Sequence, residues 1–330
     1  MTRVAINGFG RIGRTVLKKL LLNKNLIVVG INDLTDPKTL AHLFKYDSIH
    51  GKFDGTVSSA EKAIIINNQT IPVYAEKDPA MLPWKELQVD VVIESTGRFT
   101  KAELAEAHIK AGARKVIISA PGSGNLKSVV LGVNENILDG NEKIISNASC
   151  TTNNAAPMIK ILQDNWGVES AYITTVHAYT GDQNIHDAPH KDLRRARAAA
   201  QSIIPTTTGA AKAVTEIFPD LKGMIGGAGI RVPVIDGSIT DITCILKKDA
   251  TVEAINQKLL EASQGSMKGI IEYTTDPIVS VDIIGNTHSC IFDSMLTSVL
   301  GKMVKVVGWY DNEMGYSTRL AELTALVGKK

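Results

Sequence analysis

The first 35 residues alternate between short apolar runs and an amphipathic segment. Residues 3–7 form a strand-like apolar run, and residues 26–32 form a second run that is rich in β-branched side chains. Between them, Ile12, Val16 and Leu20 recur at helical spacing on one face. The pattern therefore predicts a strand, a helix and a second strand, in that order.

The same alternation continues to about residue 120. Residues 89–94 and 116–119 are predicted strands, and residues 104–111 are a predicted helix. Strands and helices that alternate in this way indicate an α/β fold with a parallel, doubly wound sheet. Residues 54–73 differ, because polar and apolar positions alternate around two asparagines at 67–68. We expect an antiparallel hairpin there, inserted in the sheet.

Beyond residue 150 the pattern changes to long apolar runs with few helices between them. A helix over residues 155–166 should be kinked or locally broken at Pro157, and a helix over 252–262 should end at Gly265. A last amphipathic helix is expected over residues 316–327. The predicted strands are 171–178, 231–234, 238–246, 289–292 and 303–310. This half is typical of an α+β domain with a mainly antiparallel sheet.

Composition narrows the class of protein. A chain of 330 residues is long enough for two domains, each with its own core. The net charge of +2 is spread along the sequence, so we expect no nucleic acid as main ligand. Cys150, Cys244 and Cys290 are odd in number, far apart and in no metal-ligand spacing, which favours a reducing compartment and no metal site. With no signal peptide and no apolar stretch long enough to cross a membrane, we expect a cytoplasmic protein.

The segment from Gly8 to Gly13 has the glycine spacing of a dinucleotide-binding turn. Gly8 permits the sharp turn, Gly10 lets the backbone approach a pyrophosphate, and Gly13 lets helix and strand pack closely. Asp33 follows Gly13 by 20 positions and would accept hydrogen bonds from the adenosine ribose, which favours NAD over NADP. Glycines in a turn are more often only turn formers. The correct order of strand, helix, strand and acid makes that alternative much weaker here.

Five further residues are candidates for contact with the dinucleotide. Arg11 and Ile12 would border the pyrophosphate and the adenine side, although both can be ordinary first-turn helix residues. Thr96, Gly97 and Ser119 follow predicted strands, and ligands of doubly wound sheets bind beyond the carboxyl ends of the strands. The alternative for these three is a simple exit from strand to loop.

Residues 149–153, S-C-T-T-N, place one thiol among polar side chains at the start of a possible helix. A helix start stabilises thiolate over thiol, so we expect a lowered pKa for Cys150 and a nucleophilic role. A free cysteine is more often a small buried hydrophobic residue, but four polar neighbours make a poor core segment. His177 ends a predicted strand and could serve as the base, although a lone histidine is more often structural.

The stretch from residue 180 to 210 is long, polar and rich in turns. Its arginine cluster at 194–197 is either a solvated face or a set of bidentate phosphate ligands. Threonine hydroxyls and the amide of Gly209 would add further donors. Arg231 stands alone in an apolar strand, where a guanidinium needs an anionic partner or a polar cavity.

Six motifs together resemble the phosphorylating glyceraldehyde-3-phosphate dehydrogenase family. They are N-G-F-G-R-I-G-R at 7–14, S-C-T-T-N at 149–153, H-A-Y-T at 177–180, H-K-D-L-R-R-A-R at 190–197, P-T-T-T-G-A-A-K-A at 205–213 and W-Y-D-N-E-M-G-Y-S at 309–317. The resemblance implies a homotetramer and a Rossmann-type NAD-binding domain over residues 1–149. It also implies a catalytic domain over 150–314 and a helix over 315–330 that packs back on the NAD-binding domain.

The resemblance also assigns roles to single residues. It implies that Cys150 is the nucleophile, that His177 is the base that activates it, and that Arg195 holds the attacking inorganic phosphate. Asn312 would bind the nicotinamide carboxamide, and Lys77 would lie near the adenosine, where many relatives have arginine. The residues implied around the phosphate sites are Ser149, Thr151, Thr180, Thr208, Gly209 and Arg231, with Thr180 and Arg231 on the phosphate of the substrate.

Residue chemistry and resemblance together predict one reaction. The protein would oxidise D-glyceraldehyde 3-phosphate with NAD through a thioester on Cys150, and inorganic phosphate would release 1,3-bisphosphoglycerate, reversibly, in glycolysis or gluconeogenesis. One alternative is an erythrose-4-phosphate dehydrogenase, which hydrolyses its thioester and needs no phosphate. A second is a non-catalytic NAD-binding sensor or a nucleic-acid-binding protein. The complete set of cysteine, histidine and arginines argues against loss of catalysis.

Overall fold

The computed structural model describes residues 1–329, and their contacts divide the chain into two units. The first unit consists of residues 1–129 and 136–148 and of the chain from Ser317 onward. The second consists of residues 130–135 and 149–316. The domain boundaries expected from the sequence stay a prediction.

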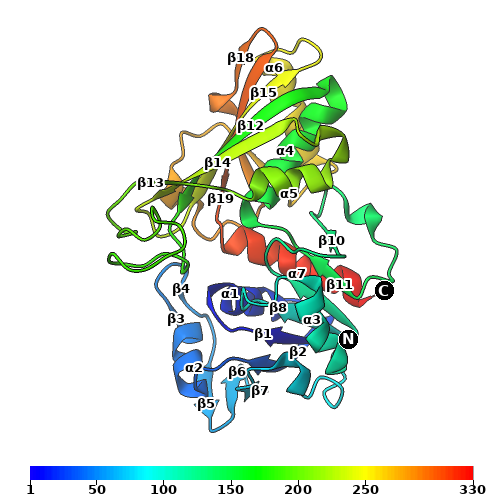
Figure 1. Ribbon diagram of the computed structural model, residues 1–330, viewed down its shortest axis with the longest axis vertical. Helices are drawn as coiled ribbons and strands as arrows, with labels where there is room; N and C mark the ends of the chain where they lie inside the picture. Colours follow the sequence, from blue (N-terminus) through cyan, green and yellow to red (C-terminus); the bar gives the residue numbers. More distant parts are fainter. Residues whose placement is uncertain (330) are drawn as a thin grey trace. The chain divides into compact units, whose positions relative to one another are not determined.

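The first unit is built on a nine-stranded sheet with the order β10-β11-β9-β8-β1-β2-β7-β6-β5 (Figure 1). All neighbours from β10 to β7 are parallel, which confirms the predicted parallel sheet. The strands are β1 (Thr2–Asn7), β2 (Leu26–Asn32), β5 (Val57–Ala60), β6 (Ala63–Ile66), β7 (Gln69–Tyr74), β8 (Val91–Glu94), β9 (Lys115–Ile118), β10 (Lys127–Ser128) and β11 (Ile144–Ser146). A separate pair is formed by β3 (Tyr46–Asp47) and β4 (Gly51–Lys52).

The predicted hairpin is confirmed at the β5 edge of this sheet. Strands β5, β6 and β7 pair antiparallel, while β7 also pairs parallel with β2. The turn between β6 and β7 holds Asn67 and Asn68 at φ values of 47° and 68°. Asparagine tolerates this left-handed conformation better than most residues, which explains its place at the turn.

Four helices accompany this sheet: α1 (Arg11–Leu20), α2 (Pro37–Lys45), α3 (Ala102–Lys110) and the final helix α7 (Met314–Gly328). The sequence analysis did not predict α2, although its start carries a recognisable signal. Asp36 caps the helix by accepting a hydrogen bond from Thr39 N, and Pro37 occupies its first turn. The predicted final helix is confirmed, and Lys115 Nζ donates to Val327 O near its end at 3.2 Å.

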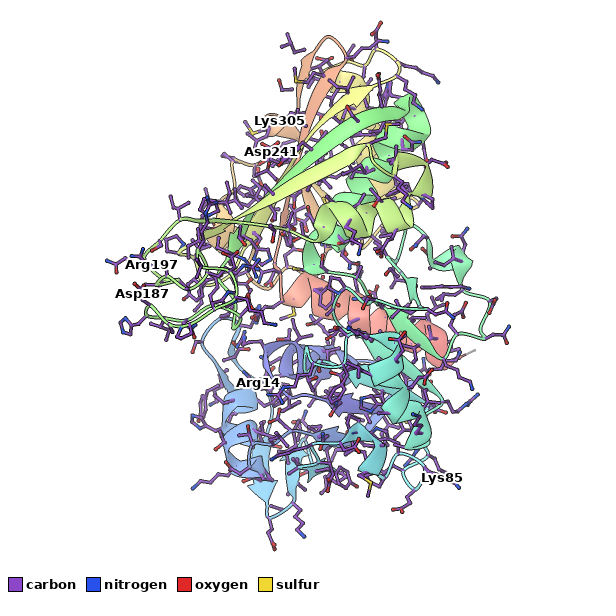
Figure 2. All side chains as sticks on the ribbon, viewed as in Figure 1. Arg14, Lys85, Asp187, Arg197, Asp241 and Lys305 are labelled. Atoms are coloured by element: carbon purple, nitrogen blue, oxygen red, sulfur yellow. The ribbon has the colours of Figure 1, made fainter. Side chains whose placement is uncertain are left out.

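The second unit is built on an eight-stranded sheet with the order β13-β14-β12-β15-β19-β17-β16, with β18 paired to β19 (Figure 1). Its strands are β12 (Val168–Ala178), β13 (Ile204–Thr206), β14 (Ile225–Val232), β15 (Ser238–Leu246), β16 (Ile271–Thr274), β17 (Cys290–Asp293), β18 (Ser298–Leu300) and β19 (Met303–Tyr310). Only β12–β14 and β16–β17 are parallel pairs, so the predicted mainly antiparallel sheet is confirmed. Across β15 and β19, Asp241 and Lys305 form an ion pair of 2.7 Å (Figure 2).

Strand β14 begins earlier than the sequence predicted. The expected strand covered residues 231–234, whereas the observed strand runs from Ile225 to Val232. Its first half is I-G-G-A-G, and glycines lack the side-chain alternation by which strands are recognised. A Cβ atom on Gly227 would lie 3.0 Å from Ala211 Cβ, so this glycine allows α5 (Ala210–Ile217) to pack closely on the strand.

The predicted break at Pro157 is wrong. Helix α4 runs from Cys150 to Trp166 and contains Pro157. Proline removes one helical hydrogen bond, but this helix buries most of its residues against β12, β15 and β19, and that packing maintains it. The helix predicted to end at Gly265 is confirmed as α6 (Val252–Gln264), with Gly265 as its C-cap.

Short 3₁₀ helices complete the secondary structure at η1 (Pro79–Met81), η2 (Glu135–Ile137), η3 (Pro219–Leu221), η4 (Ser280–Ile283) and η5 (Ser294–Leu296). Within residues 1–329, every helix is too short or too polar to cross a membrane.

Candidate active site

A cavity of about 480 Å³ lies in the first unit, where strands β1, β2 and β8 end. Five of the predicted cofactor residues line it: Gly8, Gly10, Asp33, Lys77 and Thr96. The other six do not belong to its described lining, namely Arg11, Ile12, Gly13, Gly97, Ser119 and Asn312. The remaining lining residues are Asn7, Asn32, Leu34, Glu76, Pro79, Ser95, Arg98 and Phe99.

The three glycines of the turn differ in what surrounds them. Gly8 has a φ of +90°, and a Cβ atom there would lie 2.7 Å from Thr96 N. A Cβ atom on Gly13 would lie 2.2 Å from Gly8 O, so this glycine permits close packing. Gly10 has no atom within 4 Å of such a Cβ position. Gly8 and Gly13 therefore serve the fold, and Gly10 leaves space for a ligand.

The start of α1 suits an anion. Gly10 is the N-cap and supplies no side-chain acceptor, so the first backbone N–H groups of the helix are not capped by a side chain. Such groups and the positive end of the helix dipole bind phosphate readily. The residues present therefore fit the pyrophosphate of a dinucleotide.

Asp33 faces this cavity and also braces the glycine turn. Its Oδ2 accepts a hydrogen bond from Phe9 N at 2.7 Å, and its Oδ1 accepts one from Thr35 N at 2.9 Å. A carboxylate has further lone pairs, and these can accept the hydroxyl protons of a ribose. The acid thus links the shape of the turn to recognition of the sugar.

The predicted residues outside the cavity have structural partners. Arg11 Nη1 donates to Asp47 Oδ1 at 2.9 Å, so its guanidinium is held in an ion pair. Gly97 has a φ of +71°, a value that favours glycine in the turn after β8. Ser119 N donates to Glu94 O at 2.9 Å where β9 ends. Their contact with a dinucleotide stays a prediction.

A buried polar network beneath the cavity was missed by the sequence analysis. Glu94, at the end of β8, accepts from Asn7 Nδ2 at 2.5 Å and lies 3.0 Å from His108 Nε2. Trp84 Nε1 donates to His108 Nδ1 at 3.0 Å, which fixes the proton of the neutral ring on Nε2. Thr96 donates its hydroxyl proton to Glu94, so its oxygen can only accept from a ligand. The sequence did carry one signal of this network, because Glu94 places a carboxylate at the end of an apolar strand, where it needs a polar partner.

In the second unit, Cys150 is the first residue of α4 and Ser149 is its N-cap. Ser149 Oγ accepts a hydrogen bond from Thr152 N at 3.0 Å. The predicted phosphate ligand therefore also closes the first turn of the helix that carries the thiol.

The structure brings Cys150 and His177 together. His177 lies near the end of β12, and its Nε2 is 3.4 Å from Cys150 Sγ. Its Nδ1 lies 2.7 Å from Ala178 O, and a carbonyl oxygen can only accept. Nδ1 also lies 3.0 Å from Arg231 Nη1, which can only donate, so the two contacts of Nδ1 call for opposite tautomers. With the ring proton on Nδ1, the shorter contact is a hydrogen bond to Ala178 O, and the Nε2 lone pair is directed to the thiol.

The expected low pKa of the thiol is wrong for the protein without ligands. Burial raises the pKa of Cys150, and the charge of Arg231 and hydrogen bonds from Thr151 oppose that rise. Burial, and then the charge of Arg231, lowers the pKa of His177 to about 3. Both groups favour their neutral forms for the same reason. Transfer of the thiol proton to Nε2 creates opposite charges side by side, so the two groups titrate as a pair.

Arg231 and Arg195 supply positive charge to this site. Arg231 lies opposite His177 in the β12–β14 register, and its Nη1 donates to Ala178 O at 3.0 Å. Burial, and then the charge of Arg195, lowers the pKa of Arg231. Arg195 is held by Asp182 at 2.6 Å and by the hydroxyl of Thr206 at 3.0 Å. Two adjacent guanidinium groups in a partly buried site are suited to an anion.

The arginine cluster divides between two environments. Arg197 pairs with Asp187 at 2.9 Å, and both side chains are more than half exposed (Figure 2). Arg195 is only 19% exposed and contributes to the potential at His177. Arg197 is therefore a solvated member of the cluster, whereas contact of Arg195 with phosphate stays a prediction.

The other predicted phosphate donors lie at the start of α4, after β12 and before α5. Thr151 Oγ1 lies 2.9 Å from the hydroxyl of Tyr310, and Thr208 Oγ1 accepts from Ala210 N at 3.2 Å. Gly209 is the N-cap of α5, and the carbonyl of Thr180 accepts from Gln183 N. Their contact with phosphate, and that of Ser149, stays a prediction.

Tyr310 was not predicted as a site residue. Its hydroxyl also lies 2.8 Å from Thr175 Oγ1, and its ring meets the His177 ring edge to face at 5.9 Å. Burial raises its pKa, so it remains a neutral phenol. Its position at the end of a predicted strand gave no signal of this contact.

Asn312 follows β19 in the second unit. Its Oδ1 accepts a hydrogen bond from Ser238 Oγ at 2.7 Å. Nothing in the pattern of residues around Ser238 indicated this partner.

Comparison with known proteins agrees with these two sites. Residues 2–102 match a family model described as glyceraldehyde 3-phosphate dehydrogenase, NAD binding domain, and residues 149–312 match its C-terminal domain. The chain is 57% identical over 332 residues to the glyceraldehyde-3-phosphate dehydrogenase of Thermotoga maritima, covering 100% of both proteins. It is 53% identical to those of Clostridium pasteurianum and Geobacillus stearothermophilus, covering at least 96% of each protein.

The space at Gly10 can be tested by filling it. We expect Gly10→Val to weaken NAD binding about tenfold or more, because its side chain occupies the path of the pyrophosphate, and Gly10→Ala to have a smaller effect. Calorimetric titration with NAD measures both. Unchanged binding in a Gly10→Val variant with native circular dichroism would show that this space is not used.

The charge of Arg231 can be tested at the thiol. Its charge lowers the pKa of Cys150, so Arg231→Leu should raise that pKa and decrease the thiolate fraction at a given pH. We expect alkylation of Cys150 by iodoacetamide to slow several-fold at neutral pH. Arg197→Leu, which removes an exposed arginine, serves as the control. Equal rates in the two variants would argue against the effect.

Proposed function

The chain belongs to the glyceraldehyde-3-phosphate dehydrogenase family, and we propose that Cys150 and His177 carry out its NAD-dependent oxidation of glyceraldehyde 3-phosphate. The observation that carries this assignment is the 3.4 Å distance between Cys150 Sγ and His177 Nε2. A nucleophile and its base require this kind of contact.

The first half of the reaction forms an acyl group on Cys150. His177 Nε2 takes the thiol proton, Sγ attacks the aldehyde carbon, and the imidazolium returns the proton to the carbonyl oxygen to give a hemithioacetal. NAD, when bound, supplies the hydride acceptor for the oxidation of that carbon. His177 then takes the hydroxyl proton, and a thioester remains on Sγ. The oxygen that carries developing charge is stabilised by the imidazole and by backbone N–H groups at the start of α4.

The second half transfers the acyl group to phosphate. An oxygen of inorganic phosphate attacks the thioester carbon, the thiolate leaves, and 1,3-bisphosphoglycerate is released. We assign Arg195 to the attacking phosphate and Arg231, with Thr180, to the phosphate of the substrate. The remaining proposed contacts are Ser149, Thr151, Thr208 and Gly209. The charge of Arg195, after burial, lowers the pKa of Arg231, which supports an anion in this region.

The cofactor roles follow from the cavity in the first unit. Gly10 and the start of α1 would hold the pyrophosphate, and Asp33 the adenosine ribose. Thr96 and Lys77 line the same cavity and would contact the nucleotide. We further assign Asn312 to the nicotinamide carboxamide. Contacts of Arg11, Ile12, Gly13, Gly97 and Ser119 with the cofactor are also proposed. Residues 1–149, 150–314 and 315–330 are the corresponding domains and final helix.

A requirement for inorganic phosphate distinguishes the proposed reaction from that of the main alternative, an erythrose-4-phosphate dehydrogenase. That enzyme hydrolyses its thioester and leaves no role for the second arginine. The names of the relatives do not favour it. A cytoplasmic location is proposed on the same family basis.

The decisive experiment measures NADH formation with glyceraldehyde 3-phosphate in the presence and absence of inorganic phosphate. We expect a rate that depends on phosphate, and Cys150→Ala should abolish turnover while NAD binding persists. His177→Asn should slow the reaction by a factor of about 10²–10⁴, the usual contribution of a general base. Turnover without phosphate would favour the alternative, and loss of NAD binding in Cys150→Ala would indicate a structural thiol.

A homotetramer is proposed because the second unit exposes large apolar side chains. Leu193, Ile203 and Leu300 are more than 70% exposed, which is costly for a protein that stays monomeric. Sedimentation velocity should give four times the mass of the 35.5 kDa chain at micromolar concentration. A monomer under those conditions would contradict this assignment.

A further inference from the structure

Ser238 connects two groups that the proposed function uses in different ways. It is the first residue of β15 and is only 1% exposed. Its Oγ accepts a hydrogen bond from Ala178 N at 3.1 Å and donates one to Asn312 Oδ1 at 2.7 Å. A buried serine with both a donor and an acceptor partner is well ordered.

Ala178 also contacts the catalytic residues, through the carbonyl of its next peptide group. Its carbonyl accepts from His177 Nδ1 at 2.7 Å and from Arg231 Nη1 at 3.0 Å. The Ser238 hydroxyl is therefore connected to the proposed base, His177, through the backbone of Ala178, and to Asn312 through one hydrogen bond. Such chains restrict the orientation of every member.

The hydroxyl of Ser238 has a single proton, and this decides how Asn312 is oriented. That proton is given to Oδ1, so the carbonyl end of the amide faces Ser238 and the NH₂ end is left for another partner. Among residues 1–329, no other hydrogen bond to the side chain of Asn312 competes with it. Without the serine, the two ends of the amide could exchange by rotation.

We propose that Ser238 is a positioning residue that fixes the Asn312 amide and makes it a hydrogen-bond donor to the cofactor. This rests on the proposed role of Asn312 at the nicotinamide carboxamide. A donor recognises the carbonyl oxygen of the carboxamide and is indifferent to its NH₂ group. Ser238 therefore determines that Asn312 recognises the carbonyl oxygen of the carboxamide and not its NH₂ group.

The test compares NAD with 3-acetylpyridine adenine dinucleotide, which keeps the carbonyl and replaces the NH₂ group by methyl. In Ser238→Ala, we expect kcat/KM with NAD to fall about tenfold, because the amide is no longer held. With the analogue it should fall further, because a rotated amide places Oδ1 against the acetyl oxygen. The ratio of kcat/KM for NAD to that for the analogue should thus rise about fivefold or more.

This ratio does not depend on how much of the protein is folded, since both cofactors are measured on the same sample. Ser294→Ala is the matched control, because Ser294 is also buried in this unit and its Oγ donates to Thr274 O at 2.7 Å. The control should leave the ratio unchanged. An unchanged ratio in Ser238→Ala, or an equal change in the control, overturns the proposal.

Asn312→Asp separates this proposal from the proposed function. Aspartate offers only acceptors, so the ratio should rise strongly in favour of NAD if residue 312 meets the carboxamide. A changed ratio in Asn312→Asp with none in Ser238→Ala rejects the role of Ser238 alone. No change in Asn312→Asp rejects the role of Asn312, and the inference fails with it.

Discussion

The proposed active site depends on keeping a thiol and an imidazole out of water beside a guanidinium. Burial raises the pKa of Cys150 and lowers that of His177, so neither group charges easily alone. The charge of Arg231 acts to lower both pKa values, which favours the charged form of Cys150 and disfavours the charged form of His177. Both groups therefore stay neutral at rest, while Arg231 makes the thiolate less costly and makes an imidazolium release its proton more readily.

The Ala178 carbonyl controls the geometry of this arrangement. It lies 2.7 Å from His177 Nδ1 and also accepts from Arg231 Nη1, so one acceptor orients both side chains. The register of β12 and β14 places His177 opposite Arg231, and sheet pairing thus fixes the two side chains before any ligand is present. The charged parts of the site rest on strands, which hold positions more accurately than loops.

Sequence patterns predicted the sheets and the chemistry well, and contacts between distant residues poorly. The strand at 238–246 and the strand at 303–310 have the predicted limits, because their apolar faces alternate over many residues. The first half of β14 was missed because three glycines conceal the pattern, and a break in α4 was expected because the proline rule was applied without the packing of the helix. Glu94, His108 and Tyr310 were not recognised, since their partners lie far away in sequence. The pKa of Cys150 was misjudged because burial cannot be read from neighbouring residue types.

The order of the two units along the chain has a consequence for their modularity. The backbone passes from one unit to the other after residues 129, 135, 148 and 316, so the first unit is assembled from three separate segments. No single cleavage or fusion point separates them: a fragment ending at residue 148 lacks the stretch from Ser317 onward, including the Val327 carbonyl that Lys115 binds. To exchange the second unit between relatives, it must therefore be inserted with matched junctions on both sides. The last turns of the chain and the first strand must then come from the same relative.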